Sequence, residues 1–250
     1  GLGERCTAYL KLWRNAFWLY GDKPFLQMPA CSKAELKSYG TAMPQVASGN
    51  TTLLTQLQLE PVMSDASRAL LLVEQMGFGL GGKKTDNSVI LSKGYAKGKS
   101  AKPGPSVCHM GLLHSFLLGD SILETVWLNL LTRDIIADAK QWEEGLGTAP
   151  WEKMGCPSAR ALKASLMGRL VPLSRFCLLR EDGLHYTEGI VHPDYQERMI
   201  DPSAAADKAK AKVKMLWVNP EKKPWRQLTA LLAFLESDHG SGFECLNLKQ

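Results

Sequence analysis

The feature that most constrains the fold is an aspartate-glycine pair, Asp182-Gly183, between two apolar runs at residues 175–180 and 184–191. Such a pair favours a tight turn, because aspartate and glycine tolerate the positive backbone φ that the turn requires. Apolar runs on both sides of the turn are typical of two antiparallel strands. The sequence therefore predicts a β-hairpin in the second half of the chain.

Several segments repeat apolar residues at three- and four-residue steps, which is the pattern of amphipathic helices. Ser64 can cap one of these helices, and Ser121 with Glu124 forms a capping box before another. We expect the aromatic side of the first helix to lie in the core. The predicted helices cover residues 4–20, 64–75, 122–144, 158–169 and 225–236. The apolar side of the helix at 64–75 is expected to carry Ala66, Leu70, Val73 and Met76.

The remaining segments predict short strands and long connections. Extended pieces are expected at residues 23–28, 110–118 and 212–218, and residues 201–214 are expected to form an exposed loop or helix. Residues 29–52 form a long connection with a helical turn near residues 34–37. The predicted class is α+β, with residues 1–250 forming one irregular globular domain in which helices pack on short antiparallel strands between long loops.

Composition and charge favour a protein of a reducing compartment and argue against a membrane-spanning or secreted one. The chain has 250 residues and a net charge of +5, which permits a polyanionic partner without requiring one. No apolar run is long enough to span a membrane, and the first residues lack the pattern of a signal peptide. The six cysteines are scattered singly, which indicates a reducing compartment, and we expect a cytoplasmic protein. Cys108, His109 and His114 lack a fourth ligand, so no metal is expected.

Residues 77–102 combine glycines with lysines and include a single acid, Asp86. Glycines allow close approach of the backbone to a ligand, and lysines attract phosphate without reading a base sequence. One interpretation is a loop that lies along a nucleic-acid backbone, and the other is a solvated linker between two packed elements. The lysines of this lysine-rich stretch are Lys83, Lys84, Lys93, Lys97, Lys99 and Lys102.

Sequence motifs of common enzymes are missing. There is no P-loop, no Rossmann fingerprint, no GxSxG elbow and no HExxH pair. The run GFGLGG follows a predicted helix rather than a strand, so it does not fit a dinucleotide site. A cysteine–histidine pair that meets only in the fold remains open. We expect no catalytic residue and no cofactor.

Five segments in order resemble one family, the large subunit (CasA) of the type I-E CRISPR surveillance complex Cascade. They are WRNAFWLYGDKPFLQ, VASGNT, GFGLGGK, LNLLT and, after Trp151, the hairpin with Tyr186-Thr187 and Gly189. The large subunit of that family usually has about twice this length. The chain is therefore expected to be part of its N-terminal domain, without the earliest residues and without the C-terminal four-helix bundle.

The resemblance implies a non-catalytic protein. Members of the family contact the protospacer-adjacent motif on double-stranded target DNA, hold the displaced strand, dock on the 5′ end of the crRNA beside other Cascade subunits, and help to recruit a helicase-nuclease. No membrane partner is implied. The DNA-binding residues implied are Gly79, Gly81, Gly82, Lys83, Lys84, Lys93, Lys97, Lys99 and His192, and those implied for crRNA or subunit docking are Lys33, Lys37, Tyr39, Ser48, Gly49 and Asn50.

The chain departs from the family at one place that matters for motif reading. The family has a glycine loop that enters the minor groove, whereas the corresponding residues 57–65 contain no glycine. A minor-groove lysine of the family has no clear match: His192 is nearest in one alignment and Asp194 in another. Two alternatives therefore stay open: a scaffold subunit that has lost motif reading, and a nuclease-fused variant of the large subunit.

Overall fold

The protein is described by a computed structural model. The described residues are 1–43, 45–46, 59–80, 85–86, 88–92, 106–107, 112–138, 142–155, 158–190, 201–207, 214–216, 221 and 243–248. Their helices are α1 (Leu2–Leu12), α2 (Asp65–Phe78), α3 (Ile122–Leu128), α4 (Arg133–Asp138), α5 (Ala159–Lys163) and α6 (Leu166–Leu170), with short 3₁₀ turns at Arg14–Phe17, Pro29–Lys33, Tyr39–Ala42 and Leu246–Leu248. No helix in these ranges is both long and apolar enough to cross a membrane.

Three small sheets accompany the helices. The first has the order β1 (Leu36–Lys37), β5 (Leu184–Glu188), β4 (Arg175–Leu179), and all its pairs are antiparallel. The second pairs β2 (Gly79–Leu80) with β3 (Ser106–Val107) in parallel, and the third has the order β7 (Lys214–Met215), β6 (Ala206–Asp207), β8 (Phe243–Glu244). The α+β class predicted from the sequence is confirmed.

The hairpin predicted at Asp182-Gly183 is confirmed. β4 pairs with β5 so that Leu179 lies opposite Leu184, and the Arg180 amide donates to the Gly183 carbonyl at 2.8 Å. A Cβ atom at Gly183 would lie 2.3 Å from the carbonyl oxygen of Lys37, so only glycine lets β1 approach this turn. Neither Asp182 nor Gly183 has a positive φ, so the glycine is required by the close approach of β1 and not by the turn geometry expected from the sequence.

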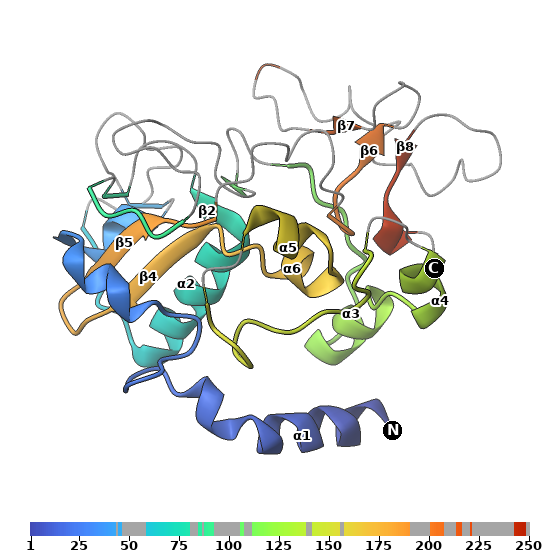
Figure 1. The fold of residues 1–250 in the computed structure, drawn as a ribbon, viewed down its shortest axis with the longest axis horizontal. Coiled ribbons are helices and arrows are strands. Elements are labelled where there is room, and N and C mark those ends of the chain that lie inside the picture. The colour runs from blue at the N-terminus through green and yellow to red at the C-terminus, as the bar shows by residue number, and fades with distance from the viewer. Residues whose placement is uncertain are drawn as a thin grey trace.

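Helix α2 begins where the sequence predicts, but it buries a different side. The Ser64 hydroxyl accepts the Ser67 amide hydrogen at 3.2 Å as an N-cap. Leu70 is 73% exposed, Val73 is 50% exposed and Ala66 is also exposed, so of the residues expected on the packing side only Met76 is buried. The buried residues of the helix include Leu71, Leu72, Gln75 and Met76, and the helix packs against β4 (Figure 1). Both sides carry apolar residues, so periodicity alone could not choose between them.

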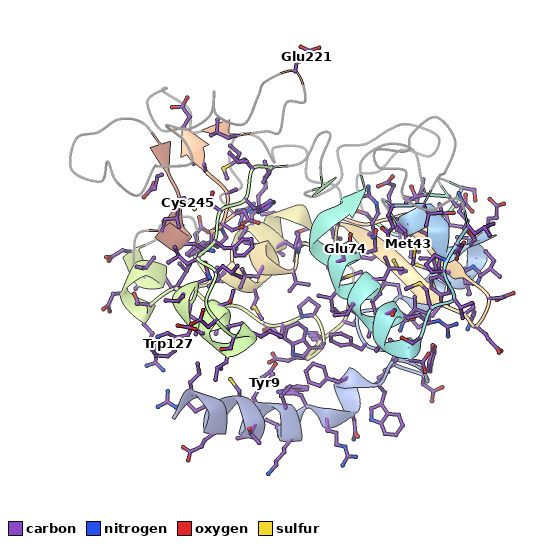
Figure 2. All side chains as sticks on the ribbon, turned by 180° about the vertical axis from the view of Figure 1, so that it is seen from behind. Tyr9, Met43, Glu74, Trp127, Glu221 and Cys245 are labelled. Atoms are coloured by element: carbon purple, nitrogen blue, oxygen red, sulfur yellow. The ribbon has the colours of Figure 1, made fainter. Side chains whose placement is uncertain are left out.

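The first helix is shorter than expected and is not core. It ends at Leu12, the Arg14–Phe17 turn follows, and none of its residues is buried. It lies along one edge of the molecule (Figure 1), with Tyr9 directed toward the rest of the chain (Figure 2). The Tyr9 hydroxyl donates to Glu152 at 2.5 Å and accepts from the Trp151 indole N–H at 2.6 Å. Periodicity identifies an apolar face but does not say what covers it.

Two predicted helices are each divided into two. The helix predicted at 122–144 is replaced by α3 and α4 in the described residues 122–138, and the helix predicted at 158–169 is replaced by α5 and α6. The Ser121 cap is confirmed, because its hydroxyl accepts the Glu124 amide hydrogen at 3.1 Å. Ser165 accepts the Gly168 amide hydrogen at 3.2 Å and starts α6 as a second cap. A serine that can cap a new helix therefore ends the preceding one.

Three strand and loop predictions are wrong. Residues 112–118 contain isolated bridge positions at Leu112 and His114, the latter paired with Ala204, instead of a strand, and Phe116 to Leu118 are exposed. Residues 23–28 form turns in which Leu26 has a positive φ of 52°. Residues 204–206 are buried and lead into β6 instead of forming an exposed tail. The helical turn expected at 34–37 lies at Pro29–Lys33, and the helix expected at 225–236 lies outside the described residues.

The main core lies between α2, the first sheet and the segment that includes Cys31, Tyr39 and Met43. A smaller cluster joins Trp142, Leu166 and Leu246. The segment expected to be a surface docking loop therefore contributes side chains to the core.

Candidate nucleic-acid interface

The base of the lysine-rich stretch is closed by a pair of strands. β2 and β3 pair in parallel, with Gly79 opposite Ser106 and Leu80 opposite Val107. Residues 81–105 therefore connect two points of the fold that lie side by side. The sequence did not indicate this closure, because each strand has only two residues.

A buried arginine lies against the first end of this connection. A Cβ atom at Gly79 would lie 2.8 Å from Cγ of Arg175, so a larger residue would displace the arginine. Arg175 is fully buried on β4, and its Nη1 lies 3.2 Å from Oε2 of Glu188 and donates to the Ser174 carbonyl at 2.8 Å. Gly79 is itself buried, so the DNA contact predicted for it is not accessible in this conformation.

The charges around Arg175 are arranged to keep it ionised. Burial disfavours the guanidinium charge, but the hydrogen bond with the Tyr186 phenol and the negative charge of Glu188 outweigh this effect, and the pKa of Arg175 is raised. Burial also raises the pKa of Tyr186, so its phenol stays neutral and donates to Gln75 Oε1 at 2.6 Å. Glu188 therefore carries the counter-charge.

The same glutamate holds the chain at Thr85, just after residues 81–84. The Thr85 hydroxyl donates to Glu188 Oε1 at 2.7 Å, and the Asp86 amide donates to the Tyr186 carbonyl at 3.0 Å. Thr85 is buried, and Leu91 packs on the main core further along the stretch. The stretch is therefore attached to the first sheet as well as closed at its base.

Asp86 joins this stretch to the predicted docking segment. Its carboxylate accepts the Glu35 amide hydrogen at 2.8 Å and the Ser88 amide hydrogen at 2.8 Å. Hydrogen bonds from Ser88, then the Glu35 amide, and finally the positive charge of Lys37 lower the pKa of Asp86. Two segments that are 51 positions apart in sequence thus lie side by side.

The predicted docking residues are placed differently from one another. Lys33 is exposed at the end of the Pro29–Lys33 turn, and Lys37 is half-buried on β1. Tyr39 is only 4% exposed, its hydroxyl donates to the Arg180 carbonyl at 2.5 Å, and burial raises its pKa to about 12. Its side chain holds the segment against the hairpin, so a docking contact by that side chain is ruled out in this conformation.

The other predicted site residues lie outside the described residues. On the DNA side these are Gly81, Gly82, Lys83, Lys84, Lys93, Lys97, Lys99 and His192, and on the docking side they are Ser48, Gly49 and Asn50. Their roles stay predictions. The residues that sequence reasoning missed are Arg175, Glu188 and Thr85, which carry no motif and meet only through the hairpin pairing.

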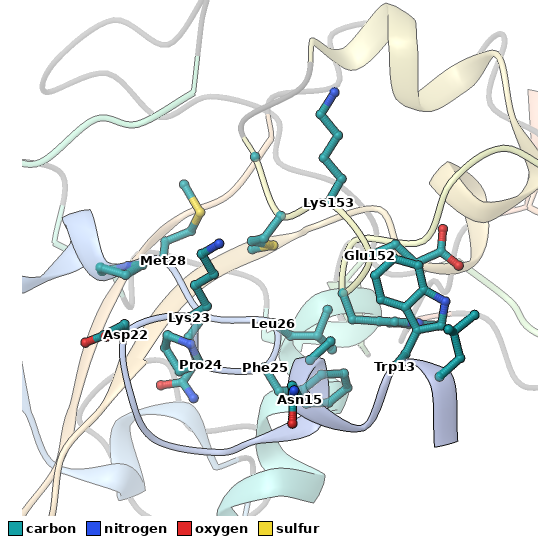
Figure 3. Close-up of a pocket in the computed structure, with 17 residues that line it drawn as sticks. Trp13, Asn15, Asp22, Lys23, Pro24, Phe25, Leu26, Met28, Glu152 and Lys153 are labelled. Atoms are coloured by element: carbon teal, nitrogen blue, oxygen red, sulfur yellow. The ribbon is translucent and has the colours of Figure 1, made fainter. Parts of the chain in front are cut away.

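A separate cavity of about 660 Å³ lies between the Arg14–Phe17 turn, residues 22–29 and residues 151–155 (Figure 3). Trp13, Phe25 and Trp151 line it together with two lysines and two acids. The acids and lysines balance in charge, and among the described lining residues none is predicted to contact DNA or crRNA. The charged lining residues are Asp22, Lys23, Glu152 and Lys153.

Nucleophilic side chains in the described part do not form an activated pair. Ser203 lies 2.7 Å from His114 Nδ1, but its hydroxyl donates to Asp201 Oδ1 at 2.6 Å. In a hydrolase triad the serine donates to the histidine, so this order is inverted. Burial raises the pKa of Cys31 to about 11, which keeps it a neutral thiol. Within the same ranges, no group of three or more His, Cys, Asp or Glu could hold a metal ion.

A family model, CRISPR-associated protein Cse1, matches residues 2–250. The chain belongs to this Cse1 family, also called CasA. It is 29% identical over 237 residues to the CRISPR-associated protein CasA/Cse1 of Thermus thermophilus, and this match covers 90% of the chain and 43% of that protein. The family recognised from the five segments is therefore confirmed.

Solved structures of the family agree in fold. The crystal structure of Thermus thermophilus CasA has a TM-score of 0.51 at 22% identity, over 97% of this chain and 46% of the other. That of Cse1 from Acidimicrobium ferrooxidans has a TM-score of 0.54 at 21% identity, over 97% and 47%. At these identities the likeness concerns the fold alone. The chain spans less than half the length of these family members.

Proposed function

We propose that the chain is a non-catalytic part of the large subunit of a Cascade complex, and that it contacts crRNA, double-stranded target DNA and the displaced strand. The observation that carries the proposal is the attachment of the lysine-rich stretch. Its base is the β2–β3 pair, and Thr85 and Asp86 tie it to the first sheet beside the docking segment. Family membership supports the same conclusion.

The charge of the stretch fits the backbone of a nucleic acid. Six lysines and one acid lie between residues 77 and 102. Lysines that neutralise phosphates release counterions and bind any sequence, which suits a displaced single strand. In RNA-guided recognition, base pairing reads the target, so the protein needs sequence-specific contacts only at the short motif. We assign Lys83, Lys84, Lys93, Lys97 and Lys99 to this electrostatic role.

We assign the docking face to the exposed surface around Lys33, at the end of the Pro29–Lys33 turn. Its neighbour β1 is fixed in the sheet, so the face is presented by a rigid support. The proposal includes contacts of this face with the crRNA 5′ end, with other Cascade subunits and with the helicase-nuclease. It places the complex in the cytoplasm. A scaffold subunit is the second candidate, because residues 57–65 lack the glycines expected of a motif reader.

Binding of duplex DNA by the assembled complex, with and without this subunit, tests the proposal across a library of flanking motifs at fixed salt. Preference for particular flanks would support a motif reader. Equal enhancement for all flanks would support an electrostatic clamp with scaffold character. No effect of the subunit on DNA affinity would refute a DNA-contacting role.

Charge reversal of Lys83, Lys84, Lys97 and Lys99 tests the stretch directly. We expect weaker DNA binding and a log–log salt slope shallower by up to about 0.9 per lost phosphate contact. Reversal of Lys11, exposed on α1, is the matched control and should change neither quantity. An unchanged slope in the quadruple variant would remove the stretch from the DNA path.

The docking role is best tested with a point substitution, because deletion of residues 33–43 would remove β1 and core residues such as Met43. We expect Lys33→Glu to weaken retention of the subunit in the complex, and Lys23→Glu to serve as the control. Full retention of Lys33→Glu would move the docking face elsewhere.

A further inference from the structure

We propose that the cavity beside α1 binds an unstacked base of the displaced DNA strand, with the base stacked on aromatic side chains of the cavity wall. This inference adds a contact away from the lysine-rich stretch. It rests on the proposed function in one respect, because it takes single-stranded DNA as a ligand of the subunit. The aromatic residues that line the cavity are Trp13, Phe25 and Trp151.

The first observation is a group of aromatic side chains that the core does not bury completely. Trp13, Phe25 and Trp151 are half-buried, and all three line the cavity (Figure 3). Phe25 and Trp151 lie in a tilted cluster with Phe17, in which the ring centroids are 5.2 to 6.1 Å apart. Stacking on aromatic rings accepts any base, because every base has a flat π-face. The cavity therefore suits a displaced strand, whose sequence changes with the target.

The second observation is that α1 is held beside the cavity although it is not part of the core. None of its residues is buried. The Tyr9 hydroxyl nevertheless donates to Glu152 and accepts from the Trp151 indole N–H, so the helix is tied to residues 151 and 152. The rings of Tyr9 and Trp13 have centroids 6.4 Å apart, which places Trp13 next to this attachment. A cavity whose wall is already fixed loses less conformational entropy when a ligand binds.

The third observation concerns the size and charge of the cavity. Its volume of about 660 Å³ lies within the roughly 300 to 1,000 Å³ of ligand pockets. Two exposed lysines and two acids line it, so its charges balance. Lys23 and Lys153 can contact the phosphates that flank a bound base, and the Asp22 carboxylate can accept a hydrogen bond from an exocyclic amino group. Because the charges balance, stacking and not counterion release supplies most of the binding free energy.

Neighbouring residues separate this cavity from the docking face and supply a control. Lys33, Lys37 and Tyr39, the described residues predicted for docking, do not line the cavity. We therefore assign the cavity to the displaced strand and not to the crRNA. Trp18 is 60% exposed and also does not line the cavity, although it is only five positions from Trp13. Its substitution removes the same kind of side chain from the same segment without changing the proposed site.

The test compares Trp13→Ala with Trp18→Ala in the full-length subunit within the assembled complex. A single-stranded thymidine oligonucleotide and an abasic oligonucleotide of the same length and charge are titrated at several salt concentrations. We expect Trp13→Ala to weaken binding of the thymidine oligonucleotide by about fivefold or more with an unchanged salt slope, because a stacking contact is lost and no phosphate contact is lost. Trp13→Phe keeps an aromatic ring and should restore most of the affinity. Trp18→Ala should bind like wild type, and the abasic oligonucleotide should bind all variants equally.

Normal binding of the thymidine oligonucleotide by Trp13→Ala, or an equal loss with the abasic one, would overturn the base site. Release of the Trp13→Ala subunit, with unchanged DNA affinity in the complexes that retain it, would also overturn it and assign the cavity to crRNA or to another subunit.

Charge reversal of the lysine-rich stretch separates the base site from the proposed function. Weaker DNA binding after charge reversal, beside normal binding by Trp13→Ala, would overturn the base site and leave the proposed function standing. A base-dependent loss in Trp13→Ala alone would support the base site and overturn the role of the stretch. Loss in neither variant would overturn both.

Discussion

Separate neutralisation of Arg175 and Glu188 should cost much more stability than neutralisation of both. Arg175 is 0% exposed and Glu188 is 14% exposed. Removing one partner of a buried pair costs about 3 to 5 kcal/mol, because a charge is left unpaired. Glu188→Gln strands the fully buried guanidinium and should fall near the upper end, about 4 kcal/mol. Arg175→Met strands a carboxylate that keeps Thr85 and some water, so about 3 kcal/mol is expected.

The double variant Arg175→Met/Glu188→Gln leaves no unpaired charge and should lose only about 1 to 2 kcal/mol. The coupling energy between the two positions is therefore expected to be about 5 kcal/mol and well above the roughly 0.5 kcal/mol seen for independent sites. Urea unfolding followed by circular dichroism at pH 7 measures all four proteins. Additive losses would show that the two side chains are not a coupled unit.

Three further outcomes follow from the described contacts. Gly189→Ala should unfold the hairpin or lower the free energy of unfolding by several kcal/mol, because its Cβ would lie 1.9 Å from the Leu173 carbonyl oxygen. Gly155→Ala is the control: its Cβ would meet nothing within 4 Å, and the variant should be neutral in thermal melting. Asp86→Asn should lower the melting temperature at pH 7, because the pKa of Asp86 is depressed in the folded protein and its ionised form is therefore stabilising. This contribution is present above about pH 4 and is lost as the pH falls through the folded pKa. The difference in melting temperature from wild type should therefore vanish in acid, and a pH-independent difference would contradict this. In native alkylation mapped by mass spectrometry, exposed Cys6 should react faster than the buried cysteines of the described residues, and a faster reaction at a buried thiol would contradict the assigned burial. The protected cysteines are Cys31, Cys177 and Cys245.

The candidate site was predictable only in part. Glycine and lysine content identified residues 77–102 as a candidate nucleic-acid contact, and the family resemblance added the docking segment. Their proximity was not predictable, because it depends on one aspartate, Asp86, that accepts the Glu35 amide hydrogen. Tyr39 illustrates the limit of the resemblance. The family likeness implied a docking role for Tyr39, and the chain folds its side chain against the hairpin.

By itself, the sequence determined the features that depend on neighbours along the chain. The Asp182-Gly183 turn and the Ser64 and Ser121 caps are local, since each needs only a few adjacent residues to adopt its geometry. Tertiary structure decided which side of α2 is buried, why α1 is not core and where the lysine-rich stretch is attached. These outcomes depend on partners far apart in sequence, above all Thr85, Arg175 and Glu188, whose side chains meet only after β4 and β5 have paired.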